Sequence, residues 1–325
     1  MMDAAPSFIL ITPTWSGDLE HYRLLRASIE RSGLRDIPHA TVVQAEDRHA
    51  FSGFGGGSLT MLSTADVLPA ALEQKRLKAR AYERMLGRHV TRIAGSLSRK
   101  IGVPSWPHYT GWHTQQICKL KLAAESECDY AVVIDSDVVV CPDATPAELL
   151  PAGSAIACYA TWGTPERLIS KVRNWVNQAS HLVHAKPEDN GRINDYFDTP
   201  FIIHVPTLRA LFEWLESEHG EPWWSVLLKQ PPRRWSEFAT YKAFLARRQT
   251  DYGQNVVWAD TEHIRYIFDT SDAERLSREV ALCFKDPAIK FVTIHSQSTG
   301  RKLWSVENWS GQLMNLITKQ DGLND

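Results

Sequence analysis

The stretch Tyr130-Ala131-Val132-Val133-Ile134-Asp135-Ser136-Asp137 decides the fold of this chain. A continuous apolar run rich in β-branched residues is typical of a strand buried on both faces, as in the parallel sheet of an α/β protein. Ligands of such sheets bind beyond the carboxyl ends of the strands. Two carboxylates at that place repel each other unless a divalent cation binds between them, because carboxylate oxygens are its preferred ligands. The sequence therefore predicts a metal and phosphate site at Asp135 and Asp137.

The first part of the chain predicts a β-α-β unit, the usual opening of a nucleotide-binding sheet. Residues 8–11 form the expected first strand, and Pro13 is expected to end it in a turn, because proline cannot continue a central ladder. Asp18 is the expected N-cap of a helix that ends near Gly33, and residues 39–44 form the second strand. Four side chains beyond these two strands are placed to contact a nucleoside: Thr12, Thr14, Trp15 and Asp47.

A helix that starts at Trp112 is expected to lead into the acid-tipped strand. Gln116 and Lys119 share one face of this helix with Trp112, and a long basic side chain so close to the acid pair can contact a phosphate. Later in the chain, residues 201–205, 279–285 and 290–295 are expected strands. The last of these ends in His295, just as the earlier strand ends in carboxylates.

Two acids are candidates for a general base near an acceptor hydroxyl, Glu237 and Asp198. Ser236-Glu237 also fits an ordinary helix start, with its acid at the positive end of the helix dipole. Several tryptophans gather in the same part of the chain. Most are expected in the core, and one of them could stack on a sugar ring. The four are Trp214, Trp223, Trp224 and Trp235.

A long helical pattern runs from Ala70 to about Arg99, with arginines at every fourth position from Arg76 to Arg92. One interpretation is a solvated helix face. The other is contact with an anionic surface, such as a membrane leaflet, a lipid-linked phosphate or an acidic glycan. The sequence leaves both open.

The composition is that of a globular protein of 325 residues, long enough for one large α/β domain or two smaller ones. The net charge of −2 gives no general attraction for nucleic acid. The five cysteines have no metal or redox spacing, so reduced, mostly buried thiols are expected. No signal peptide or membrane span is recognisable, and the expected location is the cytoplasm, with a peripheral membrane contact left open.

The strand that ends in Asp135-Ser136-Asp137 resembles the metal-dependent glycosyltransferases of the GT-A fold. In that superfamily an Asp-x-Asp pair holds Mn²⁺ or Mg²⁺ against the diphosphate of a nucleotide sugar. Near the C-terminus, His295, Gly300 and Lys302 resemble a pattern of some retaining members, in which a histidine is the third metal ligand and a lysine contacts the diphosphate. The usual spacing is His-x-x-Gly-x-x-Lys, whereas this chain has His-x-x-x-x-Gly-x-Lys.

A group of bacterial GT-A proteins, known mainly as the family of unknown function DUF6492, is closer still. The resemblance lies in four segments that make up roughly a quarter of the chain: residues 12–29, 112–137, 235–241 and 295–304. It implies one GT-A domain over residues 1–325, with a mixed, mainly parallel sheet flanked by helices and a helical insertion around residues 70–100. Residues 1–145 would bind the nucleotide sugar, and residues 146–325 would bind the acceptor and close the metal site.

The activity that this resemblance implies is transfer of a sugar from a nucleotide-sugar donor to a glycan or lipid-linked acceptor, in the biosynthesis of a surface polysaccharide. The implied metal ligands are Asp135, Asp137 and His295. Ser136 and Lys302 would join the donor site. The metal would be Mn²⁺ or Mg²⁺, since carboxylates with one imidazole suit both.

Three other functions fit part of the sequence. Asp135-x-Asp137 also matches the haloacid-dehalogenase phosphatases, in which the first acid is the nucleophile, although more than a hundred residues precede it here and its partners would be Asp269 and Asp272. A non-catalytic nucleotide- or glycan-binding protein could retain the same sheet. Nucleotidyl transfer is the weakest alternative, because no glycine-rich, basic loop follows Ile11.

Overall fold

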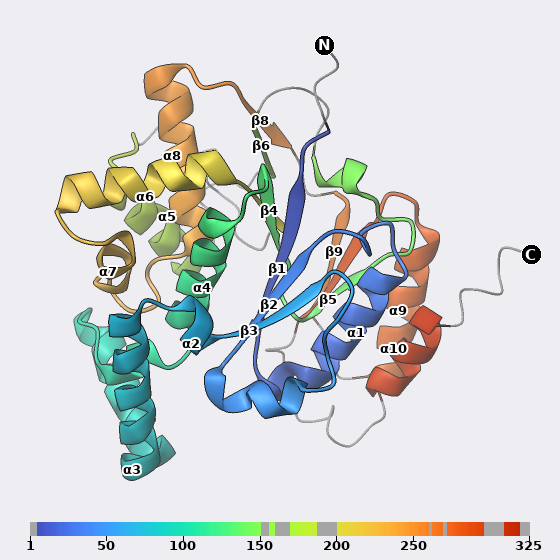
Figure 1. Ribbon diagram of the computed structural model, residues 1–325, viewed down its shortest axis with the longest axis horizontal. Coiled ribbons are helices and arrows are strands. Elements are labelled where there is room, and N and C mark those ends of the chain that lie inside the picture. The colour runs from blue at the N-terminus through green and yellow to red at the C-terminus, as the bar shows by residue number, and fades with distance from the viewer. Residues whose placement is uncertain are drawn as a thin grey trace, which may run out of the picture.

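The computed structural model describes residues 5–150, 156–159, 170–186, 200–259, 262–268, 272–295 and 309–318 (Figure 1). Its strands are β1 Phe8–Thr14, β2 His39–Val43, β3 Leu59–Ser63, β4 Tyr130–Val133, β5 Val138–Val140, β6 Ile156–Tyr159, β7 Phe201–His204, β8 Val256–Ala259, β9 Ile264–Ile267 and β10 Phe291–Ile294. Its α-helices are α1 Leu19–Glu30, α2 Thr64–Val67, α3 Ala70–Ile101, α4 Trp112–Glu125, α5 Ser170–Leu182, α6 Val205–His219, α7 Trp223–Leu228, α8 Glu237–Tyr252, α9 Ala273–Lys285 and α10 Trp309–Thr318.

The central sheet has the strand order β3-β2-β1-β4-β7. β1 to β4 run parallel and β7 is antiparallel to β4, so the predicted mixed, mainly parallel sheet is confirmed. The chain moves from β1 to β2 and β3 on one side and then returns to β4 on the other, so the order reverses between β1 and β4. In open α/β sheets such a reversal opens a ligand crevice at the carboxyl ends of the strands. Asp135 and Asp137 follow β4 at this place.

The prediction that Pro13 ends the first strand is wrong. β1 continues to Thr14, and Pro13 lies opposite Val42 of β2. The N–H of Leu10 donates towards β2, so by the alternation of a strand the nitrogen of Pro13 faces β4. Pairing with β4 ends at Ile11 and Val133, and the missing N–H therefore costs no ladder hydrogen bond.

Two groups of helices cover the central sheet. α1, α9 and α10 lie on one side and α4 to α8 on the other, which confirms the predicted flanking layers (Figure 1). Behind the acid pair, β5 pairs antiparallel with β10, and β10 pairs with β9 in a second, small sheet.

The expected strand at residues 279–285 is wrong, because this segment belongs to α9. Leu276, Val280 and Cys283 are buried at helical spacing, and the side chain of Asp272 caps the first turn. An apolar period near 3.6 residues, started by a good N-cap, favours helix over strand.

The predicted helical insertion is α3, which projects away from the sheet (Figure 1). It is broken at Gly87, whose φ of 78° and ψ of 167° are not helical. The prediction of one arginine face is wrong at Arg76, which is 1% exposed and bound by Glu46 and Glu73. Arg80 also pairs with Glu46. The first half of α3 therefore uses its arginines to attach to the body of the protein.

All five cysteines are free, as expected, and four of them are buried. In the part of the chain that the structure describes, no helix is long and apolar enough to cross a membrane.

Candidate functional site

Three predicted side chains from three elements meet beyond the carboxyl end of β4. The Lys119 ammonium of α4 lies 2.9 Å from Asp135 Oδ1 and 3.1 Å from Glu237 Oε1. Glu237 is the first residue of α8. Lys119 and Glu237 are buried, whereas the side chain of Asp135 is 39% exposed. The three charged groups are therefore buried at Glu237 and Lys119 and exposed at Asp135, whose carboxylate faces the crevice.

The protonation states in this group follow from burial and from the two carboxylates. Burial alone would lower the pKa of Lys119, but Asp135 and Glu237 outweigh it and hold that pKa above its usual value. Burial raises the pKa of Glu237, and the Lys119 ammonium acts in the opposite direction. Lys119 therefore stays a cation at neutral pH.

A relay of buried hydrogen bonds, from Arg26 to the carbonyl of Ile134, holds the backbone just before the acid pair. Arg26 Nη1 lies 2.7 Å from His39 Nδ1, so this ring nitrogen accepts and His39 Nε2 carries the proton. His39 Nε2 is 2.9 Å from Thr12 Oγ1, and that hydroxyl donates to the carbonyl of Ile134 at 2.8 Å. Thr12 is fully buried and joins β1 to the residue before Asp135. Its predicted contact with a nucleoside stays a prediction.

The backbone also brings Asp137 close to His295. The N–H of Ile294 donates to the carbonyl of Asp137 at 2.8 Å, which continues the pairing of β5 with β10 up to the acid pair. His295 is the next residue, and its ring lies 5.5 Å from that of Phe268. The strand end thus brings the backbone of His295 next to that of Asp137.

The donor set fits Mn²⁺ or Mg²⁺ in its chemistry, because it offers two carboxylates and an imidazole. Lys119 contacts Asp135 Oδ1, and Oδ2 is the oxygen that remains for a cation. Among the described residues, no three histidine, cysteine or acidic side chains already lie close enough together to hold a metal ion. Coordination by Asp135, Asp137 and His295 therefore stays a prediction.

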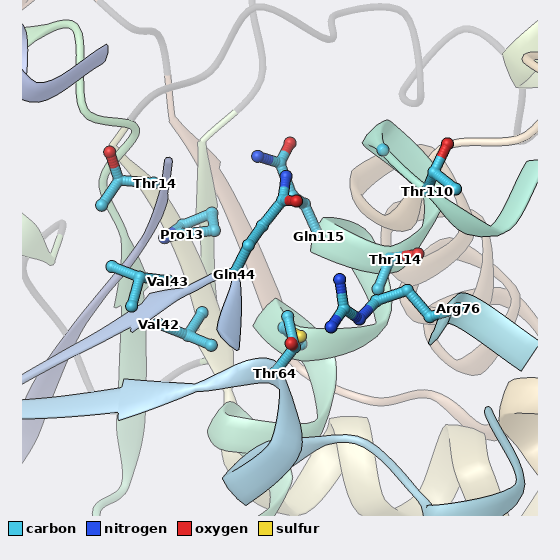
Figure 2. A pocket seen from close by; sticks show the side chains of 12 residues that line it. Pro13, Thr14, Val42, Val43, Gln44, Thr64, Arg76, Thr110, Thr114 and Gln115 are labelled. Atoms are coloured by element: carbon cyan, nitrogen blue, oxygen red, sulfur yellow. The ribbon is translucent and has the colours of Figure 1, made fainter. Parts of the chain in front are cut away.

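A narrow pocket lies beyond the ends of β1 and β2 (Figure 2). Gln44, Arg76 and Gln115 point into it from three different elements, and Thr14 lies on its wall. Its volume of about 20 Å³ is close to that of one water molecule, so a nucleoside enters only if these side chains move.

Two predicted donor-site residues have buried polar atoms without a hydrogen-bond partner among the described residues. They are Thr14 Oγ1 and Gln116 Oε1, and both side chains are 2% exposed. Gln116 lies one turn before Lys119 on α4. Buried polar groups are nearly always paired, and Thr14 lines the narrow pocket while Gln116 follows its lining residue Gln115, so both groups are candidates to bind a ligand.

Trp15 and Asp47 shape the turns beside this pocket. The indole Nε1 of Trp15 donates to Asp18 at 2.6 Å, and Asp47 accepts the N–H of Ser16 at 3.0 Å. The Trp15 ring lies over Gly17, where an added Cβ would come within 2.4 Å of it. Both residues are thus held at the predicted nucleoside side of the sheet, and contact with a nucleoside stays a prediction.

A protein-family model, the family of unknown function DUF6492, matches residues 96–286. This is more than half of the chain and includes α4, the acid pair and Glu237. The chain belongs to the DUF6492 family. No curated protein matches it.

Two similar solved structures are the galactosyltransferase LgtC in complex with donor and acceptor sugar analogues, and the bifunctional glycosyltransferase WbbM. LgtC is 14% identical with a TM-score of 0.44, over 95% of this chain and 96% of that one. WbbM is 12% identical with a TM-score of 0.44, over 98% of this chain and 51% of that one, so this chain spans about half of the WbbM chain.

The remaining predicted residues of this DUF6492 protein are placed as follows. Ser136 is buried between the two acids. Asp198 and Lys302 lie outside the described residues, as does Asp269 of the phosphatase alternative. Asp272, the second acid of the phosphatase alternative, accepts the N–H of Arg275 and caps α9. Trp235 is fully buried, with its ring 6.0 Å from that of Trp112.

Sequence reasoning missed Arg76, Glu46 and His39 as parts of the site's support. Arg76 lines the narrow pocket while Glu46 binds its guanidinium with both oxygens at 2.8 Å. His39 is the centre of the relay to Ile134. The available signal was a histidine at the start of a buried strand, since a buried imidazole needs partners on both ring nitrogens.

Proposed function

We propose that this protein is a metal-dependent glycosyltransferase that moves a sugar from a nucleotide-sugar donor to a glycan or lipid-linked acceptor. The observation that carries the proposal is the meeting of Lys119, Asp135 and Glu237 where the strand order reverses. The backbone of Asp137 is hydrogen-bonded to Ile294, the residue before His295. This edge can accept both the cation and the diphosphate of a nucleotide sugar.

The residues take distinct parts in this proposal. Asp135, Asp137 and His295 hold the divalent ion, which when bound stabilises the charge that develops on the departing diphosphate. Lys119 donates to a diphosphate oxygen, and Lys302 is proposed for the same group. Thr14 and Gln116 complete their hydrogen bonds on the donor, with Trp15, Asp47 and Ser136 around it.

Glu237 is only 2% exposed and is bound to Lys119, so it acts on the reaction by positioning that ammonium. Asp198 is then the proposed general base near the acceptor hydroxyl.

Thermal unfolding with nucleoside diphosphates and their sugars, with and without Mn²⁺, tests the proposal. We expect one nucleotide to raise the melting temperature by a few degrees only with Mn²⁺, because a ligand at 100 times its Kd stabilises by about 2.7 kcal/mol. Asp137→Ala should abolish this shift, and Asp143→Ala, a nearby acid paired with Lys290, should retain it. If no nucleotide stabilises the protein with Mn²⁺, the proposal fails.

The outer half of α3 is proposed to contact an anionic membrane surface, which would bring the enzyme to a lipid-linked acceptor. From Arg88 to Lys100 there is no acidic residue, and the apolar side chains at helical spacing are exposed by 44–68%. These are Val90, Ile93, Leu97 and Ile101. An apolar stripe among cations suits a lipid surface better than water.

Co-sedimentation with vesicles tests this contact. We expect binding to vesicles that contain phosphatidylserine and little binding to phosphatidylcholine alone, because each basic residue contributes about 1 kcal/mol at a negative surface. Ile93→Glu should weaken binding at least tenfold, whereas Leu282→Glu, which changes an equally exposed leucine on α9, should not. Equal losses in both variants would exclude α3 as the contact.

A further inference from the structure

A second and larger cavity, of about 270 Å³, lies between the outer half of α3, the start of α4 and the Pro232–Arg233 segment. Thr110 and Gly111 line both this cavity and the narrow pocket of Figure 2, so the two are neighbours. The residues of the acid pair do not line it, and nothing in the proposed donor site accounts for it.

Three arginines line this cavity, Arg92, Arg99 and Arg233, and none of its lining residues is acidic. Within the described part of the chain no carboxylate pairs with any of the three, in contrast to Arg76 and Arg80 on the same α3. Burial and the positive charge of Arg99 lower the pKa of Arg233. Unpaired like charges around one cavity are unfavourable, and an anion in the cavity would neutralise them.

The backbone of Arg233 is held in an unfavourable conformation. Its φ of 59° is in the left-handed region, which non-glycine residues rarely adopt. The N–H of Arg233 donates to His113 Nε2 at 3.0 Å, and its carbonyl accepts from Trp175 Nε1 at 2.8 Å. His113 is buried at 5% exposure and can accept because its ring is neutral. Strain that the surroundings maintain in this way is concentrated at functional sites.

Two elements connect the cavity to the acid pair. α4 begins at Trp112 in the cavity wall and carries Lys119 seven residues later, about 10 Å along the helix axis. Arg233 lies four residues before Glu237, a span of at most about 14 Å. A molecule bound by one end in the cavity can therefore extend along α4 to the proposed reaction centre.

We propose that this cavity binds a phosphate group of the acceptor, a conclusion that rests on the proposed transfer function. Guanidinium forks match phosphate oxygens, and three of them without counter-ions select an anion over a neutral sugar. An acceptor anchored there by its phosphate extends along α4 towards Lys119 and Asp135. A lipid-linked phosphate and a soluble phosphate ester share this chemistry.

Two substitutions remove guanidinium groups in different ways. Arg99→Gln shortens an exposed side chain on a helix, where little folding cost is expected. Arg233→Gly removes the second guanidinium and also relieves the left-handed backbone, so the variant should melt at the same or a higher temperature than the native protein. Arg88→Gln is the matched control, because Arg88 lies on the same helix outside the cavity wall.

Isothermal calorimetry with inorganic phosphate, without metal or nucleotide, tests the inference. We expect binding by the native protein and by Arg88→Gln, and affinity lowered at least tenfold in Arg99→Gln and Arg233→Gly. No binding by the native protein, or binding that persists in both cavity variants, overturns the inference. Phosphate held by Lys119 would persist in both and disappear in Lys119→Met.

A second measurement identifies the source of the phosphate. If the acceptor is a lipid phosphate, vesicles with phosphatidic acid should bind more tightly than phosphatidylserine vesicles of the same charge density, and both cavity variants should lose that gain. If the two kinds of vesicle bind equally while binding of inorganic phosphate falls in both variants, the acceptor is a soluble ester. Vesicle binding unchanged in both variants excludes a lipid phosphate from the cavity.

The outcome is separate from that for the donor site. The Mn²⁺-dependent nucleotide shift should be retained in Arg99→Gln and Arg233→Gly. If that shift is absent in the native protein while phosphate still binds, the transfer function fails and the cavity remains an anion site. If the shift is present and phosphate does not bind, only the cavity proposal fails.

Discussion

Lys119 is the residue on which the candidate site depends, because its ammonium contacts both carboxylates of the group, the buried Glu237 and the partly exposed Asp135. Lys119→Met would leave Glu237 buried without its cation. Removing one partner of a buried ion pair costs about 3–5 kcal/mol, so we expect a loss of that size in the free energy of unfolding. Lys121→Met is the control, since Lys121 pairs with Glu125 near the surface and should cost less than about 1 kcal/mol.

Urea denaturation of the two variants measures the difference, and a double variant tests its cause. Adding Glu237→Gln to Lys119→Met removes the stranded charge, so part of the lost stability should return. Equal losses for the two lysine variants, or no recovery in the double variant, would show that the buried pair is not formed.

At this scale the sequence was informative where chemistry is local. The contact of Asp135 with Lys119 could be predicted, because α4 leads directly into the strand that ends at the acid pair. Arg76 could not be placed, since the four-residue repeat of arginines does not show which part of the helix the body covers. Glu46, which covers it, is thirty residues away in the chain.

At the scale of the element, Gly87 is the residue at which α3 is broken and changes direction. Its φ of 78° and ψ of 167° are open to glycine alone, so Gly87→Ala should lower the free energy of unfolding by about 1–3 kcal/mol. Gly95 lies in the regular part of the same helix, and an added Cβ meets atoms no closer than 3.5 Å. Gly95→Ala should therefore stabilise by about 0.5–1 kcal/mol. Chemical denaturation of both variants checks the opposite signs, and a shift in the same direction would contradict the break at Gly87.

The elements predicted well were those with a strong and unambiguous pattern. β4, α4 and β10 could be predicted from their buried runs and helix faces. β6, β8 and β9 have four residues each and little alternation, and they are strands because partners distant in sequence pair with them. The segment 279–285 resembles a strand only when it is considered alone, without the N-cap Asp272 and the buried Leu276 that start α9.

Buried neutral histidines set the response of the whole molecule to acid. Burial is the main cause that lowers their pKa values from 6.5, to about 3 for His39, about 4 for His108, about 2 for His113 and about 4 for His263. A lowered pKa in the folded state gives stability that is complete above the unfolded pKa of about 6.5 and is lost as the pH falls towards the folded value. Acid should therefore lower the free energy of unfolding of this protein progressively below about pH 6.5.

His39 gives this expectation its sharpest test. Each such histidine should remove about 1.4 kcal/mol of stability per pH unit below about 6.5, or about 2 kcal/mol at pH 5. His39→Gln can keep the relay, because an amide accepts from Arg26 and donates to Thr12, yet it does not titrate. Its unfolding free energy should therefore depend on pH between 6.5 and 5 with a slope lower by about one proton, as measured by urea denaturation at several pH values. An unchanged slope in His39→Gln would mean that His39 is not held neutral, and that protonation does not break the relay from Arg26 to Ile134.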